Sequence, residues 1–178
     1  MVVFTIGHST RTAAELIALL RDAEIAAVVD VRRFPGSRRH PQFNAETLER
    51  SLADSSIRYR HLAALGGRRG AREAGGESPH TLWREAAFRN YADYAETADF
   101  RAAFAELLTL ARERRSAIMC AEALWWRCHR RIIADYLIAS GIAVEHVLAP
   151  GKIEPAQLTT GAAPRPDGTI LYGAARLL

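Results

Sequence analysis

Residues 118–131 read Ile-Met-Cys-Ala-Glu-Ala-Leu-Trp-Trp-Arg-Cys-His-Arg-Arg, and the segments on either side of them decide the expected fold. The apolar segment Ser116–Cys120 is typical of a buried strand. The apolar residues after the stretch have the spacing of one helix face: Ile132, Ile133, Tyr136 and Leu137. The stretch is therefore expected to be a strand-to-helix turn. In open α/β sheets such turns lie over the carboxyl ends of the strands, where ligands bind and free backbone N–H groups favour anions.

Strand-like and helix-like segments alternate along the rest of the chain. The expected strands are Val2–Ile6, Ala26–Val31, Ile57–His61, Ser116–Cys120 and Ala143–Val147. The expected helices are 13–20, Ala45–Leu52 with Asn44 as its cap, Glu85–Glu96, Phe100–Glu113 and Trp126–Ser140. This alternation predicts an α/β fold with a mainly parallel open sheet and helices on both faces, the three-layer architecture of Rossmann-like and flavodoxin-like proteins.

The chain has 178 residues, which is enough for one compact domain with a core. We assign residues 1–148 to a single α/β domain. The proline-rich tail, 149–178, contains a strand-like segment at Thr169–Tyr172 and is expected to pack on the domain or on a partner subunit, so a homodimer is left open. Residues 66–79 hold five glycines without periodicity and are expected to form a long loop.

The formal charge of +4 and the pI of about 9.5 admit an anionic small molecule or nucleic acid as a partner. All but one of the basic residues are arginine, so only the position of an arginine is informative. No apolar run is long enough for a membrane span, and the first residues lack the features of a secretion signal. The two cysteines make a poor disulfide framework, and a cytoplasmic location is expected.

Three segments are predicted to meet at the carboxyl edge of the sheet. They are Gly7–Thr10, Asp30–Arg39, and the stretch from Cys120 to Arg130. In the first segment, Ser9 or Thr10 can bind phosphate or cap the next helix. Thr12 and Glu15 offer a capping box for the same helix. An imidazole is not needed for capping, so a functional role is favoured for His8.

In the second segment, Asp30 follows four apolar residues and would be costly to bury without a partner. The nearby arginines suit bidentate recognition of carboxylate or phosphate, and Arg32 and Arg38 are the candidates for substrate binding. The alternative is a structural ion pair between Asp30 and an arginine, with the other arginines solvated.

The cysteines allow three interpretations. A zinc site is disfavoured because Cys120, Cys128 and His129 lack the spacing of a closed tetrahedral site, so we predict no metal. In the second interpretation Cys120 is a nucleophilic thiolate, more reactive than Cys128, and Glu122 and His129 transfer protons. In the third, Cys120 is structural and Glu122, His129 and His8 are the acid–base groups. Cys128 and Arg130 are candidates for substrate contact.

Several ordered motifs resemble the domain-of-unknown-function 488 family between residues 3 and 148. They are Thr5–Ser9, Asp30–Arg32 with Pro35 and Ser37-Arg38, Phe43, Tyr59–His61, Leu65–Gly67, Phe88–Ala92, Cys120–Glu122 and Cys128–Arg130. The resemblance implies a cytoplasmic prokaryotic α/β protein whose motif residues cluster at one site. It implies no settled activity and no known cofactor.

A weaker likeness is to rhodanese-like sulfurtransferases and related phosphatases, in which a strand ends in a cysteine and a helix follows. Here the residues after Cys120 include no glycine, and the carboxylate of Glu122 would repel a bound anion. The preferred hypothesis is an enzyme acting on a phosphorylated or nucleotide-like substrate, which can be part of a nucleic acid. The competing hypothesis is a non-enzymatic binding module that stacks bases on Trp83, Trp125 and Trp126 and holds phosphates with Arg68–Arg72.

Overall fold

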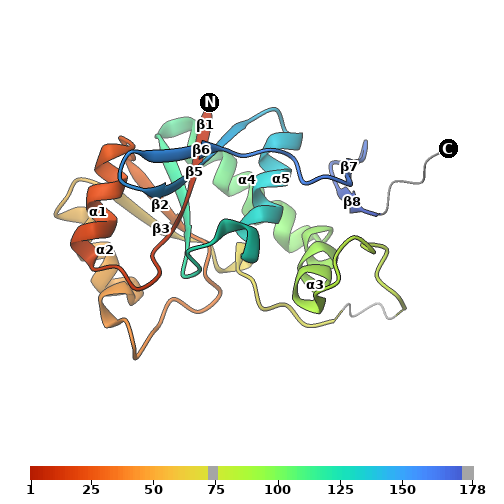
Figure 1. Ribbon diagram of the computed structural model, residues 1–178, viewed down its shortest axis with the longest axis horizontal. Coiled ribbons are helices and arrows are strands. Elements are labelled where there is room, and N and C mark those ends of the chain that lie inside the picture. The colour runs from red at the N-terminus through yellow and green to blue at the C-terminus, as the bar shows by residue number, and fades with distance from the viewer. Residues whose placement is uncertain (72–75, 174–178) are drawn as a thin grey trace.

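The computed structural model describes residues 1–71 and 76–173. Within this part of the chain six strands form one sheet in the order β3-β2-β4-β1-β5-β6 (Figure 1). The strands are β1 (Val2–Gly7), β2 (Ala27–Asp30), β3 (Arg58–His61), β4 (Ser116–Cys120), β5 (Ala143–Ala149) and β6 (Lys152–Pro155). The first five are parallel to their neighbours, and β6 is antiparallel to β5. The mainly parallel α/β fold is confirmed.

The helices cover both faces of this sheet. The helices α1 (Ala13–Asp22) and α2 (Ala45–Ala53) lie on one side, and α3 (Ala86–Ala95), α4 (Ala98–Glu113) and α5 (Arg130–Ala139) lie on the other (Figure 1). The strands alternate accordingly, since Phe4 and Ile6 pack with α1 and α2 while Val3 packs with the opposite helices. The helices therefore complete the predicted three-layer architecture.

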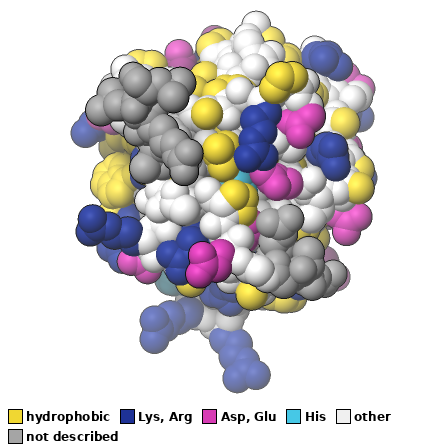
Figure 2. All heavy atoms as spheres, turned by 90° about the vertical axis from the view of Figure 1, so that its right-hand side faces the viewer, with side chains coloured by type: hydrophobic (Ala, Val, Ile, Leu, Met, Phe, Trp, Pro, Cys, Tyr) yellow, Lys and Arg dark blue, Asp and Glu magenta, His cyan; other side chains and the backbone are white. Residues whose placement is uncertain are grey.

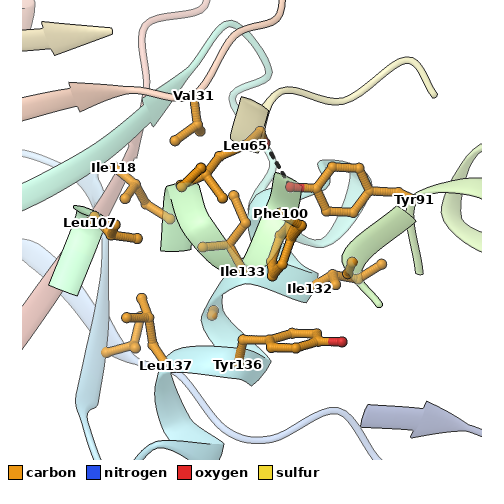
Figure 3. Close-up of a cluster of buried hydrophobic side chains, with 14 of the residues drawn as sticks. Val31, Leu65, Tyr91, Phe100, Leu107, Ile118, Ile132, Ile133, Tyr136 and Leu137 are labelled. Carbon is orange, nitrogen blue, oxygen red and sulfur yellow. Dashed lines mark hydrogen bonds between the residues drawn. The ribbon is translucent and has the colours of Figure 1, made fainter. Parts of the chain in front are cut away.

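The larger of the two cores lies between the sheet and the helices α3, α4 and α5. Figure 3 shows Ile118 of β4 facing Leu107 of α4 and Ile133 of α5 in this core. Tyr91 of α3 is buried and donates a hydrogen bond from its hydroxyl to the carbonyl oxygen of Leu65 at 2.6 Å (Figure 3). This bond ties α3 to the segment that follows β3, and both border the site described below.

The helix α1 begins at the capping box that the sequence offers. The Thr12 hydroxyl accepts from the backbone N–H of Glu15, and the Glu15 carboxylate accepts from the backbone N–H of Thr12. Ser9 and Thr10 are therefore not needed as caps. Asn44 occupies the cap position of α2 as predicted, but its side chain accepts a hydrogen bond from the backbone N–H of Ser37 instead of from the helix.

The predicted start of the helix at Trp126 is wrong, because α5 begins at Arg130. A short 3-10 turn over Trp125–Arg127 precedes it, and Cys128 has an extended backbone with φ −122° and ψ 147°. An extended residue ends one helical segment before the next begins. Because of this break, the side chains of Cys128, His129 and Arg130 do not have the directions that they would have as successive residues of one continuous helix.

The tail after β5 contacts the rest of the chain. Two short strands, β7 (Ala162–Pro164) and β8 (Ile170–Tyr172), form a hairpin, and Ile170 and Tyr172 are buried in the larger core. The Tyr172 hydroxyl donates to Asp135 of α5 at 3.0 Å. Strand β5 runs to Ala149, one residue past the predicted end of the domain. Residues 174–178 of the predicted tail lie outside the described residues.

The connections place a topological switch point between β1 and β4. The chain leaves β1 toward α1 on one face, whereas it leaves the neighbouring β4 toward α5 on the opposite face (Figure 1). The two departing loops therefore diverge, which opens a crevice at the carboxyl ends of these strands. The fold alone thus marks the position at which a ligand is expected.

On the face shown in Figure 2, cationic and anionic side chains are interspersed with hydrophobic ones. No single-sign patch dominates that face, so the net positive charge is not concentrated there. Among the helices of residues 1–71 and 76–173, none is long and apolar enough to cross a membrane.

Candidate functional site

A cavity of about 650 Å³ lies over the carboxyl ends of β1, β2 and β4, at the switch point. Residues from all three predicted segments contribute to its wall, and so do residues from the α3 region and the loop after β3. The polar and charged residues that line it are His8, Ser9, Thr10, Arg32, Arg33, Ser37, His40, Arg68, Tyr91, Cys120, Glu122, Arg127, Cys128 and His129. The structure thus brings most of the predicted site residues to one concave surface.

The loops after β1 and β4 are held together by backbone hydrogen bonds. The N–H of His8 donates to the carbonyl oxygen of Cys120, and the N–H of Ser9 donates to that of Ala121, both at 2.9 Å. A Cβ atom at Gly7 would lie 2.0 Å from the carbonyl oxygen of Glu122. Gly7 therefore permits a close approach between two protein segments.

Asp30 and Arg32 form a buried ion pair beneath the cavity. The Arg32 guanidinium donates to the Asp30 carboxylate at 2.6 and 2.9 Å, and also to the carbonyl oxygen of Phe43 at 2.8 Å. The hydroxyl of Tyr59 donates to the same carboxylate at 2.7 Å. Asp30 is fully buried and does not line the cavity. Its contacts therefore match the alternative in which Asp30 forms a structural ion pair with an arginine. Arg32 reaches the cavity wall but most of its donors are already engaged.

His8 is buried between Arg32 and Phe43. Its Nδ1 lies 2.9 Å from the carbonyl oxygen of Ser9, so Nδ1 carries the proton, and Nε2 accepts from Arg32 at 3.3 Å. Its ring stacks on Phe43 with 4.0 Å between centroids. Burial and the neighbouring Arg32 charge lower the pKa of His8 to about 4. His8 is a neutral imidazole with both ring nitrogens in hydrogen bonds. It is therefore better suited to holding the cavity wall in place than to transferring protons.

Cys128 is the thiol with the stronger positive surroundings. Its Sγ accepts a hydrogen bond from Arg130 Nε at 3.3 Å and lies 3.6 Å from His129 Nδ1. Burial raises the pKa of Cys128, but the hydrogen bond from Cys120 and the charges of His129 and Arg130 outweigh it and hold the pKa well below its usual range. These contacts favour Cys128 as the thiolate of the pair.

The surroundings of the two thiols differ from those expected from the sequence, because the positively charged groups contact Cys128. The interaction with Cys128 and burial raise the pKa of Cys120 well above its usual value. The sequence places Cys120 at a strand end near a helix start, but the arginine and the imidazole contact Cys128 instead. These contacts favour Cys128 over Cys120 as the more acidic thiol, and the order in which the two thiols ionise stays a prediction.

His129 is fixed by the backbone of β2. Its Nε2 lies 2.9 Å from the carbonyl oxygen of Val31, which accepts, so Nε2 carries a proton and Nδ1 faces Cys128. The ring also lies 5.0 Å from that of Tyr91, between centroids. A Cβ atom at Gly67 would lie 2.8 Å from His129 Nδ1. The ring is therefore enclosed by β2, α3 and the loop after β3, in one orientation toward the thiolate.

Three exposed arginines line the cavity, and one of them, Arg68, belongs to the segment Arg68–Arg72 that was predicted to hold phosphates. They are Arg33, Arg68 and Arg127, and Arg33 Nη1 donates to the carbonyl oxygen of Arg68 at 2.6 Å. Each comes from a different loop, so only the folded chain brings them together. Glu122 is the acidic residue among the lining residues, and its exposed side chain accepts from the backbone N–H of Leu124.

Two predicted substrate contacts lie outside the cavity wall. Arg38 is exposed on the loop after β2 and does not line the cavity. Arg130 is buried below it, where its guanidinium donates to Cys128 and to the carbonyl oxygen of Glu122. Its position supports the thiolate and the loop rather than direct contact with a substrate in the cavity.

The tryptophans proposed as stacking platforms have other contacts. Trp83 is buried and stacks on Phe88 at 5.0 Å, and Trp125 stacks on His146 at 4.1 Å. None of the three tryptophans, including the exposed Trp126, lines the cavity. In the predicted phosphate-binding segment Arg68–Arg72, Arg69 donates to backbone carbonyl oxygens and stacks on Tyr94, while Arg72 lies outside the described residues.

Cys120, Cys128 and His129 are also the residues that could hold a metal ion. Their ligand atoms lie within 4.8 Å of one another, which the spacing in the sequence did not indicate. However, Arg130 already donates to the Cys128 sulfur, and its charge opposes a second cation there. The absence of zinc stays a prediction. Elemental analysis of purified protein should find well under one zinc per chain, and one zinc per chain would contradict it.

The sequence matches a family model over residues 12–137, which span the elements from α1 to α5 and both cysteines. No curated protein and no solved structure matches the chain. The match covers more than half of the sequence and includes the second and third segments that meet at the cavity. The chain therefore belongs to the family described as Domain of unknown function DUF488.

Proposed function

We propose that the chain is a thiolate-dependent enzyme acting on a small anionic substrate, phosphorylated or nucleotide-like, with Cys128 as its nucleophile. The observation that carries the proposal is the position of Cys128 in the cavity wall, with Arg130 Nε at 3.3 Å and His129 Nδ1 at 3.6 Å from its sulfur. A cysteine paired with a histidine that is itself oriented by a third group is the usual arrangement of an activated thiol. Here the orienting group is the carbonyl oxygen of Val31.

The charges of the cavity favour an anion. Three exposed guanidinium groups line the cavity, those of Arg33, Arg68 and Arg127. Among the lining residues, Glu122 alone carries a negative charge that would repel an anion. Guanidinium groups bind phosphate and carboxylate in two-point contacts. A substrate held by these arginines would place its reacting group toward the thiolate below them.

The acid–base steps have two candidates. His129 can exchange a proton with the substrate or the thiol through Nδ1, because its other nitrogen is already committed to Val31. Glu122 lies at the cavity wall with an exposed carboxylate, where it can take up or deliver a proton as the leaving group departs. His8, which stays neutral and engaged, holds Arg32 instead.

The contacts support the other hypotheses less well. The binding module expected from the sequence stacks bases on the three tryptophans, but none of them lines the cavity. A sulfurtransferase or phosphatase with Cys120 as nucleophile would need that thiol to be acidic, whereas its hydrogen bond to Cys128 and its burial raise its pKa.

The proposal is tested by screening phosphorylated and nucleotide-like small molecules for turnover by the reduced protein. Cys128→Ala should abolish turnover of any substrate found. Glu122→Gln should lower turnover by about 10²-fold and leave binding of the substrate intact. Exposed Glu49 of α2, remote from the cavity lining, gives the matched control Glu49→Gln, which should retain full activity.

Binding is measured separately, with inorganic phosphate as the probe. Arg127→Gln and Arg68→Gln should weaken its binding, whereas Arg21→Gln on exposed α1 should not. Turnover that survives in Cys128→Ala would contradict the proposed nucleophile. Binding that depends on the arginines without turnover of any compound would favour the binding module instead.

A further inference from the structure

We infer that Cys128 and Cys120 form a hydroperoxide-reducing pair, in which Cys128 attacks the peroxide and Cys120 converts the product to an intramolecular disulfide. This redox activity goes beyond the proposed function and shares with it only the reactivity of the Cys128 sulfur. The pair accounts for every cysteine of the chain, and both residues have free thiols in the structure.

The two sulfur atoms are placed for this reaction. They lie within 4.8 Å of each other, at the end of β4 and just before α5. A disulfide requires about 2 Å between the sulfurs, so they must approach by less than about 3 Å. Cys128 precedes α5 in an extended backbone rather than inside a helix, so its side chain is not held by a helical turn. The geometry thus demands a local adjustment and no rearrangement of the sheet.

The cavity gives a small oxidant access to both sulfurs. Cys120 and Cys128 are almost fully buried with respect to bulk solvent, yet both line the cavity wall. A hydroperoxide is small enough to enter this cavity of about 650 Å³. Oxidation of the pair by a peroxide follows from this access, because susceptibility depends on thiolate character and exposure.

The groups around Cys128 match the needs of the reaction. The sulfur requires stabilisation as a thiolate, which Arg130 Nε provides at 3.3 Å. The oxygen that leaves the peroxide requires a proton, for which His129 Nδ1 lies 3.6 Å from the sulfur. The Cys120 sulfur lies within 4.8 Å of the Cys128 sulfur in the same cavity wall, so the second thiol is next to the sulfur that becomes oxidised.

The steps balance with the hydroperoxide as the only oxidant. The Cys128 thiolate attacks one peroxide oxygen, the O–O bond breaks, and the departing oxygen takes a proton to leave as water or an alcohol. Sulfur loses two electrons and becomes a sulfenic acid. The Cys120 thiolate, formed as its proton passes to the sulfenic hydroxyl, then attacks the Cys128 sulfur, which forms the S–S bond and releases water.

The experiment treats the reduced, chelator-washed protein with hydrogen peroxide, then blocks free thiols and measures intact mass and peptide maps. The wild type should lose the mass of two hydrogens and show a Cys120–Cys128 disulfide that dithiothreitol reverses. Cys120→Ala should stop at the sulfenic acid, gaining one oxygen on Cys128 that a cyclic 1,3-dione traps. Cys128→Ala should keep Cys120 reduced at the same peroxide dose.

Circular dichroism of both variants establishes that they are folded before oxidation, and Cys120→Ser replaces Cys120→Ala if the smaller side chain unfolds the chain. A wild type that keeps both thiols alkylatable, or a first oxidation at Cys120, overturns the inference. If Cys128 then still supports turnover of an anionic substrate, the proposed function stands without the redox pair. Formation of the disulfide in a protein without any turnover supports the pair and leaves the proposed function unsupported.

Discussion

Asp30→Ala is expected to lower the free energy of unfolding by about 3–5 kcal/mol, because it leaves the buried Arg32 guanidinium without its counterion. The carboxylate lies 2.6 Å from Arg32 Nη2 and also accepts from the Tyr59 hydroxyl, so one substitution removes several contacts. Urea titration of the wild type and the variant gives the difference in unfolding free energy.

The matched control is the exposed pair of Arg60 and Glu106. Its oxygen–nitrogen distance is also 2.6 Å, but the side chains of Arg60 and Glu106 are 58% and 40% exposed. Glu106→Ala should therefore cost less than about 1 kcal/mol. Equal losses for Asp30→Ala and Glu106→Ala would show that burial does not amplify the cost of breaking the Asp30–Arg32 pair.

Acidification is expected to destabilise the protein through His8 and His146. Burial lowers the pKa of each to about 4, from 6.5 in the unfolded chain, so below pH 6.5 the unfolded state binds more protons than the folded state. Stability is therefore lost as the pH falls from about 6.5 to about 4, by roughly 3 kcal/mol for each histidine.

His146→Gln separates this effect from the titration of carboxylates. His146 does not line the cavity, its Nδ1 lies 2.7 Å from the Thr5 hydroxyl oxygen and its ring stacks on Trp125, so glutamine replaces a titrating side chain with one that does not titrate. The variant should lose about 3 kcal/mol less than the wild type between neutral pH and about pH 4. The free energy of unfolding is measured by urea titration at each pH. If it depended on pH equally in the wild type and in the variant, the loss of stability in acid could not be assigned to His146.

The sheet and the position of the site follow from patterns that a sequence displays directly. Apolar runs such as Ser116–Cys120 identify the strands, and parallel strands must bring their carboxyl ends to one edge. Gly7–Thr10 and Cys120–Glu122 therefore meet as predicted. The helix start at Arg130 was not predictable from spacing, because the apolar pattern continues through Trp126 while the backbone is interrupted at Cys128.

The chemical roles within the site depend on side-chain directions that spacing does not give. Cys128 is favoured as the acidic thiol because the residues on its carboxyl side, His129 and Arg130, contact its sulfur after that interruption. The arginines of the opening come from three loops, and Arg68 follows two glycines in a segment without periodicity. The motif Cys-His-Arg is the sequence signal that favours Cys128, because an imidazole one residue on and a guanidinium two residues on contact its sulfur.

The most direct test of the account is the rate at which iodoacetamide alkylates each cysteine in the folded protein, followed by peptide mapping from about pH 5 to pH 9. The account predicts that Cys128 reacts at least about tenfold faster than Cys120 at neutral pH, and that inorganic phosphate in the cavity slows this reaction. In denatured protein both should react alike, with the pH dependence of an ordinary thiol near 8.5. Faster labelling of Cys120, or an unreactive Cys128 at about pH 8, would contradict the account.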